Sequence, residues 1–328
     1  MTVLVTGGAG FIGSRLVEAL LAKGERVRVY DVKAGEASRL SDLGAETLAG
    51  DILDKGRIRT ALDGCKSVFH LAARLSMWEP DPGVYHRVNV EGTRSVLESA
   101  LDAGVERVVH TSSAVTIGEA QGRIGTEETT RRGYFLSRYE RSKYLGEQVA
   151  LDLCGRGLPV VILNPTTVYG PRQVINQTGA IIRLLEGRLP VVANAQFNYV
   201  YVDDVVEGHL AAMELGSIGE RYILGGQNIT MVEFFSMAGE IARVSTRSRA
   251  VPGFLLKSAA LALGAVSLMT RRRPAISIDE ARRASHSFIM DTRKATEELG
   301  LEWTPLRVGL ERTVNWLRQE GLVEGANP

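Results

Sequence analysis

The feature that most constrains this chain is a glycine-rich turn near its N-terminus. Gly7, Gly10 and Gly13 are spaced three residues apart, directly between an apolar run and a helical pattern. Glycine permits a tight turn and lets backbone N–H groups approach a pyrophosphate, which the positive end of the next helix stabilises. Many glycine turns are only turns, but this position after the first predicted strand indicates a dinucleotide-binding site. We expect Phe11 and Ile12, in the same turn, to contribute to it.

Short apolar segments alternate with amphipathic helices along the first half of the chain. Such alternation predicts an α/β fold with a doubly wound parallel (Rossmann) sheet, whose strands are apolar on both faces. The predicted strands are 3–6, 27–30, 46–48, 67–71, 107–111 and 160–163, and the clearest helices are 14–23 and 88–102.

The regular alternation of predicted strands and helices ends after Pro171, where we expect a smaller, mostly helical substrate lobe. We predict a Rossmann domain at 1–170, to which 198–225 returns, and a substrate-binding lobe formed by 171–197 and 226–328. In this part of the chain the pattern predicts helices at 181–188 and 203–215 and strands at 198–202 and 221–224.

The bulk composition excludes several classes of function. The 328 residues carry a formal net charge of +1, so nucleic acid is not a favoured partner. The two cysteines, Cys65 and Cys154, form neither a metal-binding spacing nor a disulfide framework, and we expect no metal. A reducing cytoplasm is the simplest location, and no signal peptide is expected before the first strand.

One apolar segment, 254–270, is followed by three arginines at 271–273. It is short for a membrane span, which needs about 20 apolar residues. A buried or lobe-packing helix is the favoured interpretation. Two other interpretations remain open: the segment lines the binding site of a hydrophobic substrate, or it forms a helix that lies on a membrane surface.

Asp31 ends the second predicted strand and is the candidate that selects the cofactor. A carboxylate there accepts hydrogen bonds from the adenosine ribose and repels a 2′-phosphate, which favours NAD over NADP. Lys33 and Arg39 lie near enough to keep NADP open. Further cofactor contacts are expected from Asp51 and Ile52 after the third strand, although a strand-end cap explains Asp51 nearly as well, and from Leu71, Ala72 and Ala73 after the fourth.

Tyr139 and Lys143 are the candidate catalytic pair. Residues four apart on a helix share one face, so both can reach one point. An adjacent ammonium is expected to lower the tyrosine pKa from about 10, and Ser113 is expected to fix the substrate oxygen while Tyr139 transfers its proton. His70 and His110 lie at strand ends with no metal-like cluster, which favours hydrogen-bonded structural histidines.

These residues give the chain a clear resemblance to the extended short-chain dehydrogenase/reductase superfamily. The matching segments include TGGAGFIG, HLAA, NVEGT, TSSAVTIG, YERSK and NPTTVYGP. The resemblance implies a Rossmann enzyme that uses Ser113, Tyr139 and Lys143, and a homodimer formed through helices near 88–102 and 139–153. It also implies cofactor contacts from Asn89, Thr111, Ser112, Tyr139, Lys143, Pro165, Thr166 and Val168.

Within the superfamily, the chain looks like the dihydroflavonol-reductase-like and 3β-hydroxysteroid-dehydrogenase-like oxidoreductases, and like the subgroup labelled hopanoid-associated sugar epimerase. Nucleotide-sugar epimerases usually carry an asparagine where this chain has Thr167, and an arginine near the run 196–199. These departures favour hydride transfer between a ketone or aldehyde and an alcohol on an apolar or small organic substrate.

Two alternatives remain open. A nucleotide-sugar epimerase or dehydratase with tightly bound NAD would use the same three catalytic residues, and Arg172, Arg183 and Arg273 could bind its phosphates. A non-catalytic NAD-binding sensor would keep the glycine turn but would not need Tyr139 and Lys143. Met77 and Trp78 could line the substrate pocket or pack structurally.

Overall fold

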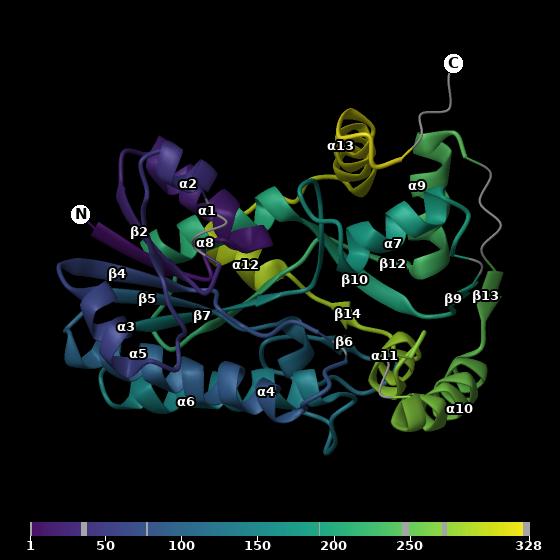
Figure 1. Ribbon diagram of the computed structural model, residues 1–328, viewed down its shortest axis with the longest axis horizontal. Coiled ribbons are helices and arrows are strands. Elements are labelled where there is room, and N and C mark those ends of the chain that lie inside the picture. Colours follow the sequence, from purple (N-terminus) through teal and green to yellow (C-terminus); the bar gives the residue numbers. More distant parts are fainter. Residues whose placement is uncertain are drawn as a thin grey trace.

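A seven-stranded sheet forms the largest layer of the computed structural model, which describes residues 2–33, 38–76, 78–189, 191–244, 249–270 and 274–323. All neighbouring strands pair in parallel, in the order β11-β7-β5-β4-β1-β2-β3 (Figure 1). The strands are β1 (Thr2–Thr6), β2 (Arg26–Asp31), β3 (Glu46–Ala49), β4 (Cys65–His70), β5 (Arg107–Thr111), β7 (Val160–Pro165) and β11 (Arg221–Leu224).

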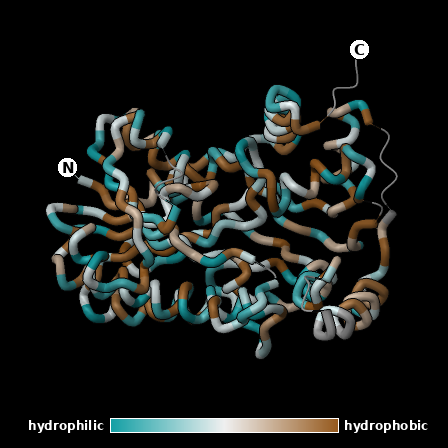
Figure 2. Tube along the Cα trace, in the orientation of Figure 1, coloured by the Kyte–Doolittle hydropathy of each residue, from teal (hydrophilic) through white to brown (hydrophobic). Residues whose placement is uncertain are grey.

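Helices cover both faces of this sheet. One face carries α3 (Lys55–Leu62), α5 (Thr93–Asp102) and α6 (Arg138–Gly155), and the other carries α1 (Phe11–Ala22), α8 (Val202–Glu214) and α12 (Arg293–Leu299) (Figure 1). Every residue of β7 is buried, and hydrophobic residues run through the central strands (Figure 2). This two-sided burial explains why the strands are apolar without alternation, and it confirms the predicted Rossmann fold.

The remaining elements are short or belong to the part of the chain after Pro171. Before it lie α2 (Ser38–Asp42), α4 (Gly83–His86), a π-helix (Arg87–Gly92), a 3₁₀ turn (Ala114–Thr116), β6 (Ile124–Gly125) and β8 (Thr167–Tyr169). After it lie α7 (Asn176–Leu185), β9 (Val191–Ala193), β10 (Gln196–Tyr201), β12 (Gln227–Thr230), α9 (Met231–Ala242), β13 (Arg249–Val251), α10 (Gly253–Thr270), α11 (Ile278–Ala284), β14 (Ile289–Met290) and α13 (Leu306–Gln319).

The segment 198–225 is divided between two sheets. Helix α8 packs against α1, and β11 adds an edge strand to the main sheet. Strand β10 instead forms a separate three-stranded sheet with β8 and β12, so the expectation that it rejoins the Rossmann sheet is wrong. The buried Asn198 side chain binds both Gly226 and Asn228 at the start of β12, which holds β10 in the smaller sheet.

Two predicted helices also differ from the structure. The helix expected at 88–102 begins as the π-helix Arg87–Gly92 and becomes α-helical only at Thr93. Helix α7 starts at Asn176, five residues before the predicted start, and ends at Leu185. Helix boundaries depend on tertiary packing that periodicity alone does not contain.

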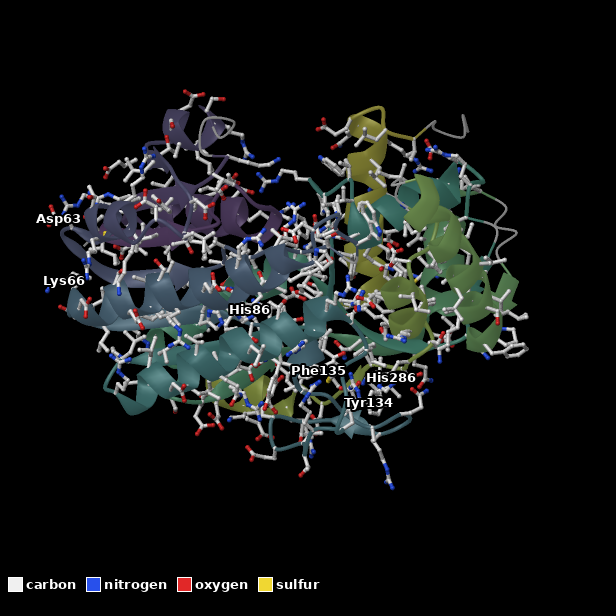
Figure 3. The ribbon with its side chains drawn as sticks, turned by 60° about the horizontal axis from the view of Figure 1, so that its bottom comes forward. Asp63, Lys66, His86, Tyr134, Phe135 and His286 are labelled. Carbon is white, nitrogen blue, oxygen red and sulfur yellow. The ribbon has the colours of Figure 1, made fainter. Side chains whose placement is uncertain are left out.

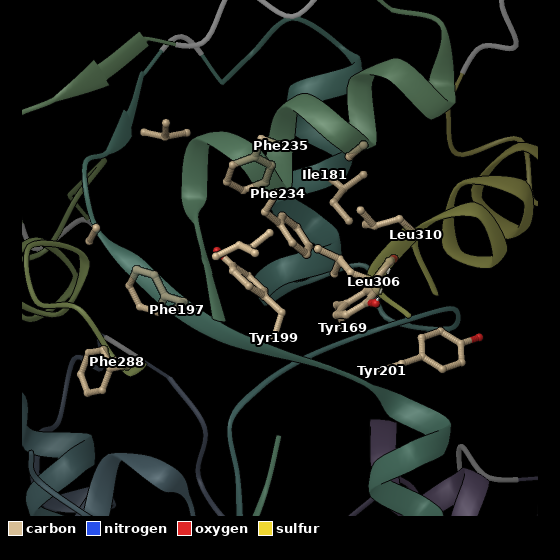
Figure 4. Packing of buried hydrophobic residues seen from close by; sticks show 14 of the residues in the cluster. Tyr169, Ile181, Phe197, Tyr199, Tyr201, Phe234, Phe235, Phe288, Leu306 and Leu310 are labelled. Carbon is tan, nitrogen blue, oxygen red and sulfur yellow. Dashed lines mark hydrogen bonds between the residues drawn. The ribbon is translucent and has the colours of Figure 1, made fainter. Parts of the chain in front are cut away.

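An aromatic cluster fills the smaller part of the molecule and reaches the carboxyl edge of the main sheet (Figure 4). Tyr199 and Phe234 stack with ring centroids 4.0 Å apart, and Phe197 and Phe288 stack at 5.7 Å. Tyr139 of α6 belongs to the same buried cluster. The predicted catalytic tyrosine therefore lies where the Rossmann layers meet the aromatic core.

Candidate active site

The glycine turn is packed too closely to admit side chains. Gly7 has a φ of +74°, and a Cβ at this position would lie 2.6 Å from the Ala72 nitrogen. A Cβ on Gly13 would lie 2.2 Å from the Gly7 carbonyl oxygen. Gly10 is the N-cap residue of α1 and has no side chain that could bind the backbone amides of the first helical turn. This cradle fits the pyrophosphate of a dinucleotide, with Phe11 and Ile12 opening the helix.

Asp31 is held against this turn. Its Oδ2 accepts a hydrogen bond from the Ala9 backbone nitrogen at 3.1 Å, and its Oδ1 accepts one from the Lys33 nitrogen at 2.9 Å. The carboxylate is thus fixed at the end of β2, where a ribose would lie. Arg39, which kept NADP open, forms an ion pair with Glu18 at 2.5 Å. These contacts favour NAD, because the Arg39 charge is already matched.

Asp51 and Ile52 occupy the turn after β3, where both side chains have internal contacts. The exposed Asp51 carboxylate accepts a hydrogen bond from the Leu53 nitrogen at 3.0 Å, which is the strand-end cap considered above. Ile52 is buried, and a Cβ on Gly92 would lie 2.5 Å from its Cδ1. Both residues lie where the adenine of the dinucleotide is expected to bind. Their contacts with the cofactor remain a proposal.

The segment Leu71–Ala73 leaves β4 directly beside the glycine turn. Leu71 donates its backbone N–H to the Thr6 carbonyl at 3.0 Å, and Ala72 is the residue that a Gly7 side chain would strike. The small side chains of Ala72 and Ala73 therefore keep two loops close together at the carboxyl edge of the sheet.

Asn89 has a structural position within the π-helix. Its Oδ1 accepts from the Arg74 nitrogen at 2.7 Å, and its Nδ2 donates to the Arg74 carbonyl and to Ser142 Oγ. A Cβ on Gly146 would lie 2.2 Å from the Asn89 carbonyl oxygen. Asn89 therefore fixes the loop after β4 against α6, so its proposed cofactor role is to position that loop.

Tyr139, Ser113 and Lys143 lie together at the edge of the sheet. Ser113 opposes the burial-driven rise in the Tyr139 pKa, and Lys143 Nζ donates to the Thr111 carbonyl at 2.9 Å. Helix α6 begins just before them, because the Ser137 side chain caps it by accepting from the Glu140 nitrogen. The structure thus brings the three predicted catalytic residues into one group.

The expected lowering of the Tyr139 pKa is not found. Burial raises the pKa of Tyr139, and the groups that oppose this rise are Ser113 and Arg283. Burial also lowers the pKa of Lys143 to about 8, against the charge of Glu147, which raises it. Burial therefore dominates the pKa of both side chains, because it disfavours the charged form of each. The phenol is therefore protonated at neutral pH.

Thr111 and Ser112 direct their side chains towards protein partners. Thr111 Oγ1 hydrogen-bonds to His209 Nε2 at 2.8 Å, while His209 Nδ1 lies 2.7 Å from the Val205 carbonyl. Ser112 Oγ donates to Glu147 Oε2 at 2.5 Å. Both hydroxyls orient the strand end that carries Ser113.

Glu147 was missed by the sequence-based predictions. It is fully buried, and its Oε2 also accepts from Thr116 Oγ1 at 2.7 Å and from Asn164 Nδ2 at 2.8 Å, while Arg221 pairs with its Oε1. It lies four residues after Lys143, on the helix face already shared with Tyr139. Continuing that spacing by one more turn would have identified it.

Pro165, Thr166 and Val168 follow β7 at the same edge of the sheet. Thr166 donates its N–H to the Leu224 carbonyl at 2.9 Å and its hydroxyl to Asn198 Oδ1 at 2.9 Å. Val168 packs against the apolar core of the main sheet. The segment closes the site towards the second part of the chain, and its cofactor contacts remain a proposal.

The two strand-end histidines differ. His70 is hydrogen-bonded to Thr6 and Thr93, as expected of a structural histidine, and burial lowers its pKa to about 3. His110 stacks on His70 with ring centroids 5.2 Å apart, yet neither of its ring nitrogens has a hydrogen-bond partner among the described residues. The expectation of a hydrogen-bonded histidine is therefore wrong for His110.

Of the three arginines proposed for phosphate binding, two lie among the described residues. Arg172 forms two hydrogen bonds with Glu18, at 2.7 and 3.0 Å, and Arg183 is exposed on α7. Arg273 and Met77 lie outside the described residues. Trp78 is half-buried, and its backbone is hydrogen-bonded to Ser76.

A cavity of about 600 Å³ lies beside the catalytic group but is not lined by it. Tyr134, Phe135 and His286 gather there (Figure 3). Its other lining residues are Gln121, Leu136, Lys257, Arg282 and Ser285. Within the described ranges there is no cluster of metal-ligating side chains and no helix long and apolar enough to cross a membrane.

Comparisons with known proteins agree with this geometry. A protein of Synechocystis sp., provisionally named dihydroflavonol 4-reductase, is 34% identical over 98% of this chain and 95% of its own length. Sterol demethylase protein B of Methylococcus capsulatus is 33% identical over 98% of this chain and 100% of its own.

Solved structures share the whole fold. The crystal structure of gox2253 matches with a TM-score of 0.87 at 34% identity, covering 98% of this chain and 99% of that one. UDP-glucose 4-epimerase of Thermotoga maritima, solved with UDP-glucose, matches with a TM-score of 0.80 at 27% identity over 98% and 99% of the two chains. Residues 3–225 match the model of the NAD dependent epimerase/dehydratase family. The chain therefore belongs to this family of NAD-dependent enzymes, within the extended short-chain dehydrogenase/reductase superfamily.

Proposed function

We propose that this enzyme interconverts a ketone or aldehyde and an alcohol with NAD(H), on an apolar or small organic substrate. The observation that carries the proposal is the setting of Tyr139, which is buried in a cluster of aromatic and aliphatic side chains with Ser113 acting on its pKa. An apolar enclosure around one polar pair suits an apolar substrate with a single reacting oxygen.

Each catalytic residue has a role that follows from its position. NAD, held by the glycine turn and Asp31, supplies or accepts the hydride. Tyr139, whose phenol burial keeps protonated, donates its proton to the carbonyl oxygen during reduction. Ser113 orients that oxygen, and the Lys143 ammonium, fixed on the Thr111 carbonyl, lies one helical turn from the phenol.

The substrate is proposed to bind between the sheet edge and the lobe formed by 171–197 and 226–328. Helices α5 and α6, which pack together, are the proposed homodimer contact. Nucleotide-sugar epimerisation is the second candidate, favoured by the solved UDP-glucose 4-epimerase. The Arg172–Glu18 pair supports the reductase, because this guanidinium already has a carboxylate partner. Thr167 supports it as well, because it stands where nucleotide-sugar epimerases usually carry an asparagine.

Turnover of a panel of ketones with NADH and with NADPH tests the proposal. We expect NADH-dependent reduction of apolar ketones, no conversion of UDP-glucose, and a loss of at least about 10²-fold in kcat for Tyr139→Phe. Tyr134→Phe is the matched control, because this exposed tyrosine lies outside the catalytic group. Reduction at an unchanged rate by Tyr139→Phe, or turnover of UDP-glucose alone, would refute the proposal.

A further inference from the structure

Helix α11 brings a second charged residue to the catalytic tyrosine. The Asp279 carboxylate accepts a hydrogen bond at 3.0 Å from the backbone nitrogen of Arg138, the first residue of α6 and the neighbour of Tyr139. Arg283 lies four residues after Asp279 and therefore on the same face of α11. The contact of α11 with the N-terminus of α6 thus also directs Arg283 towards the catalytic group.

The guanidinium of Arg283 is surrounded by aromatic rings. It lies 5.8 Å from the ring centroid of Phe288 and 6.0 Å from that of Phe197, two rings that stack side by side in the cluster (Figure 4). Its Nε is buried without a hydrogen-bond partner. Its charge also interacts with the hydroxyl groups of Tyr139 and Tyr199.

Arg283, which is partly buried, differs in this respect from Arg132 and Arg221. Arg132 is paired with Glu140, and Arg221 with Glu147. For Arg283, no ion pair with a carboxylate is formed among the described residues, and Glu140, whose charge acts on it, is already bonded by Arg131 and Arg132. A buried charge without an acidic partner is costly, so such a group is retained where a ligand completes it.

We propose that Arg283 binds a carboxylate of the substrate, a few bonds from the carbon that gains or loses the hydride. The inference rests on the proposed function and narrows it to oxo acids and hydroxy acids with an apolar chain. A guanidinium matches a carboxylate in charge and geometry, and the stacked rings of Phe197 and Phe288 beside it offer an apolar surface for the rest of the substrate. A diphosphate brings at least two negative charges, which one guanidinium among aromatic rings does not balance.

A matched pair of substrates tests the inference. The probes are 3-oxodecanoate and its methyl ester, each reduced to the 3-hydroxy compound with NADH as hydride donor and with Tyr139 supplying the proton to the carbonyl oxygen. We expect the unchanged enzyme to prefer the acid in kcat/KM by about 10- to 100-fold, the usual range for a hydrogen bond to a charged group. Arg283→Met should lower kcat/KM for the acid far more than for the ester and so abolish this preference, and Arg283→Lys should restore part of it.

Arg282→Met is the control, because it removes the same charge from the exposed neighbouring position. Calorimetric binding of decanoate to the NAD-loaded protein gives a readout that needs no turnover, and Arg283→Met should weaken it at least about tenfold. The melting temperature of Arg283→Met should not fall, because an unpaired buried charge is removed.

Three results would overturn the inference. The first is that Arg283→Met prefers the acid as strongly as the unchanged enzyme does. The second is that Arg282→Met loses this preference to the same extent as Arg283→Met. The third is that the protein binds UDP-glucose and not decanoate, and that Arg283→Met weakens this binding. Failure of the proposed function is distinguished by Tyr139→Phe, because full activity of that variant refutes the mechanism whatever Arg283 does.

Discussion

Replacing Gly13 by alanine tests the cofactor cradle at the point where the geometry is tightest. The added Cβ would lie 2.2 Å from the Gly7 carbonyl oxygen and 2.9 Å from the Gly8 Cα. Both neighbours are backbone atoms, which no side-chain rotation can move. Helix α1 must therefore shift by about 1 Å or more to restore van der Waals contact.

This shift should affect cofactor binding more than stability. Overpacking of this kind costs about 1–3 kcal/mol of unfolding free energy, which leaves a protein of this size folded. The same shift moves the first-turn amides of α1 away from the phosphates, and loss of two charge-assisted hydrogen bonds corresponds to at least about 10²-fold weaker binding. We expect NADH affinity, measured by calorimetry, to fall by that factor or more.

Gly155→Ala provides the matched control for Gly13→Ala. Gly155 is the last residue of α6, and a Cβ built there would meet nothing within 4 Å. This variant should bind NADH as the unchanged protein does. Unaltered NADH affinity in Gly13→Ala, with an unaltered melting temperature, would refute both the packing argument and the assignment of the turn.

Three further predictions concern charges at the site. Glu147→Gln removes the charge that raises the Lys143 pKa, so the alkaline limb of the plot of kcat/KM against pH should move to lower pH. An unmoved limb would contradict the electrostatic coupling between Glu147 and Lys143. Because burial lowers the pKa of Lys143 from 10.5 to about 8, the unfolded chain binds this proton more strongly, and unfolding free energy should rise from pH 8 towards pH 10 by up to about 3 kcal/mol. Urea unfolding measures this rise, and its persistence in Lys143→Met would exclude Lys143 as the source. Asp31→Asn should move the KM preference towards NADPH by about tenfold, because the variant no longer repels a 2′-phosphate.

The sheet could be predicted from the sequence because its signals are local. Each central strand is a short apolar run that must be buried on both faces, and the glycine turn fixes the first strand–helix junction. Strand β10 pairs with β8 and β12, which its own sequence does not indicate. Its buried Asn198 binds Gly226 and Asn228, and these partners lie some thirty residues later in the chain.

The placement of the candidate catalytic residues Tyr139 and Lys143 on one helix face was predictable for the same reason, whereas their electrostatics were not. The spacing of Tyr139 and Lys143 places both on one helix face, but it does not contain the burial that raises one pKa and lowers the other. Glu147 extends that spacing by one turn and could have been found. Arg283 could not, because its relation to Tyr139 exists only once α11 docks on the N-terminus of α6. A charge that approaches the site across such a contact is invisible to any local pattern, and this is the kind of residue that can distinguish substrates among enzymes sharing one catalytic set.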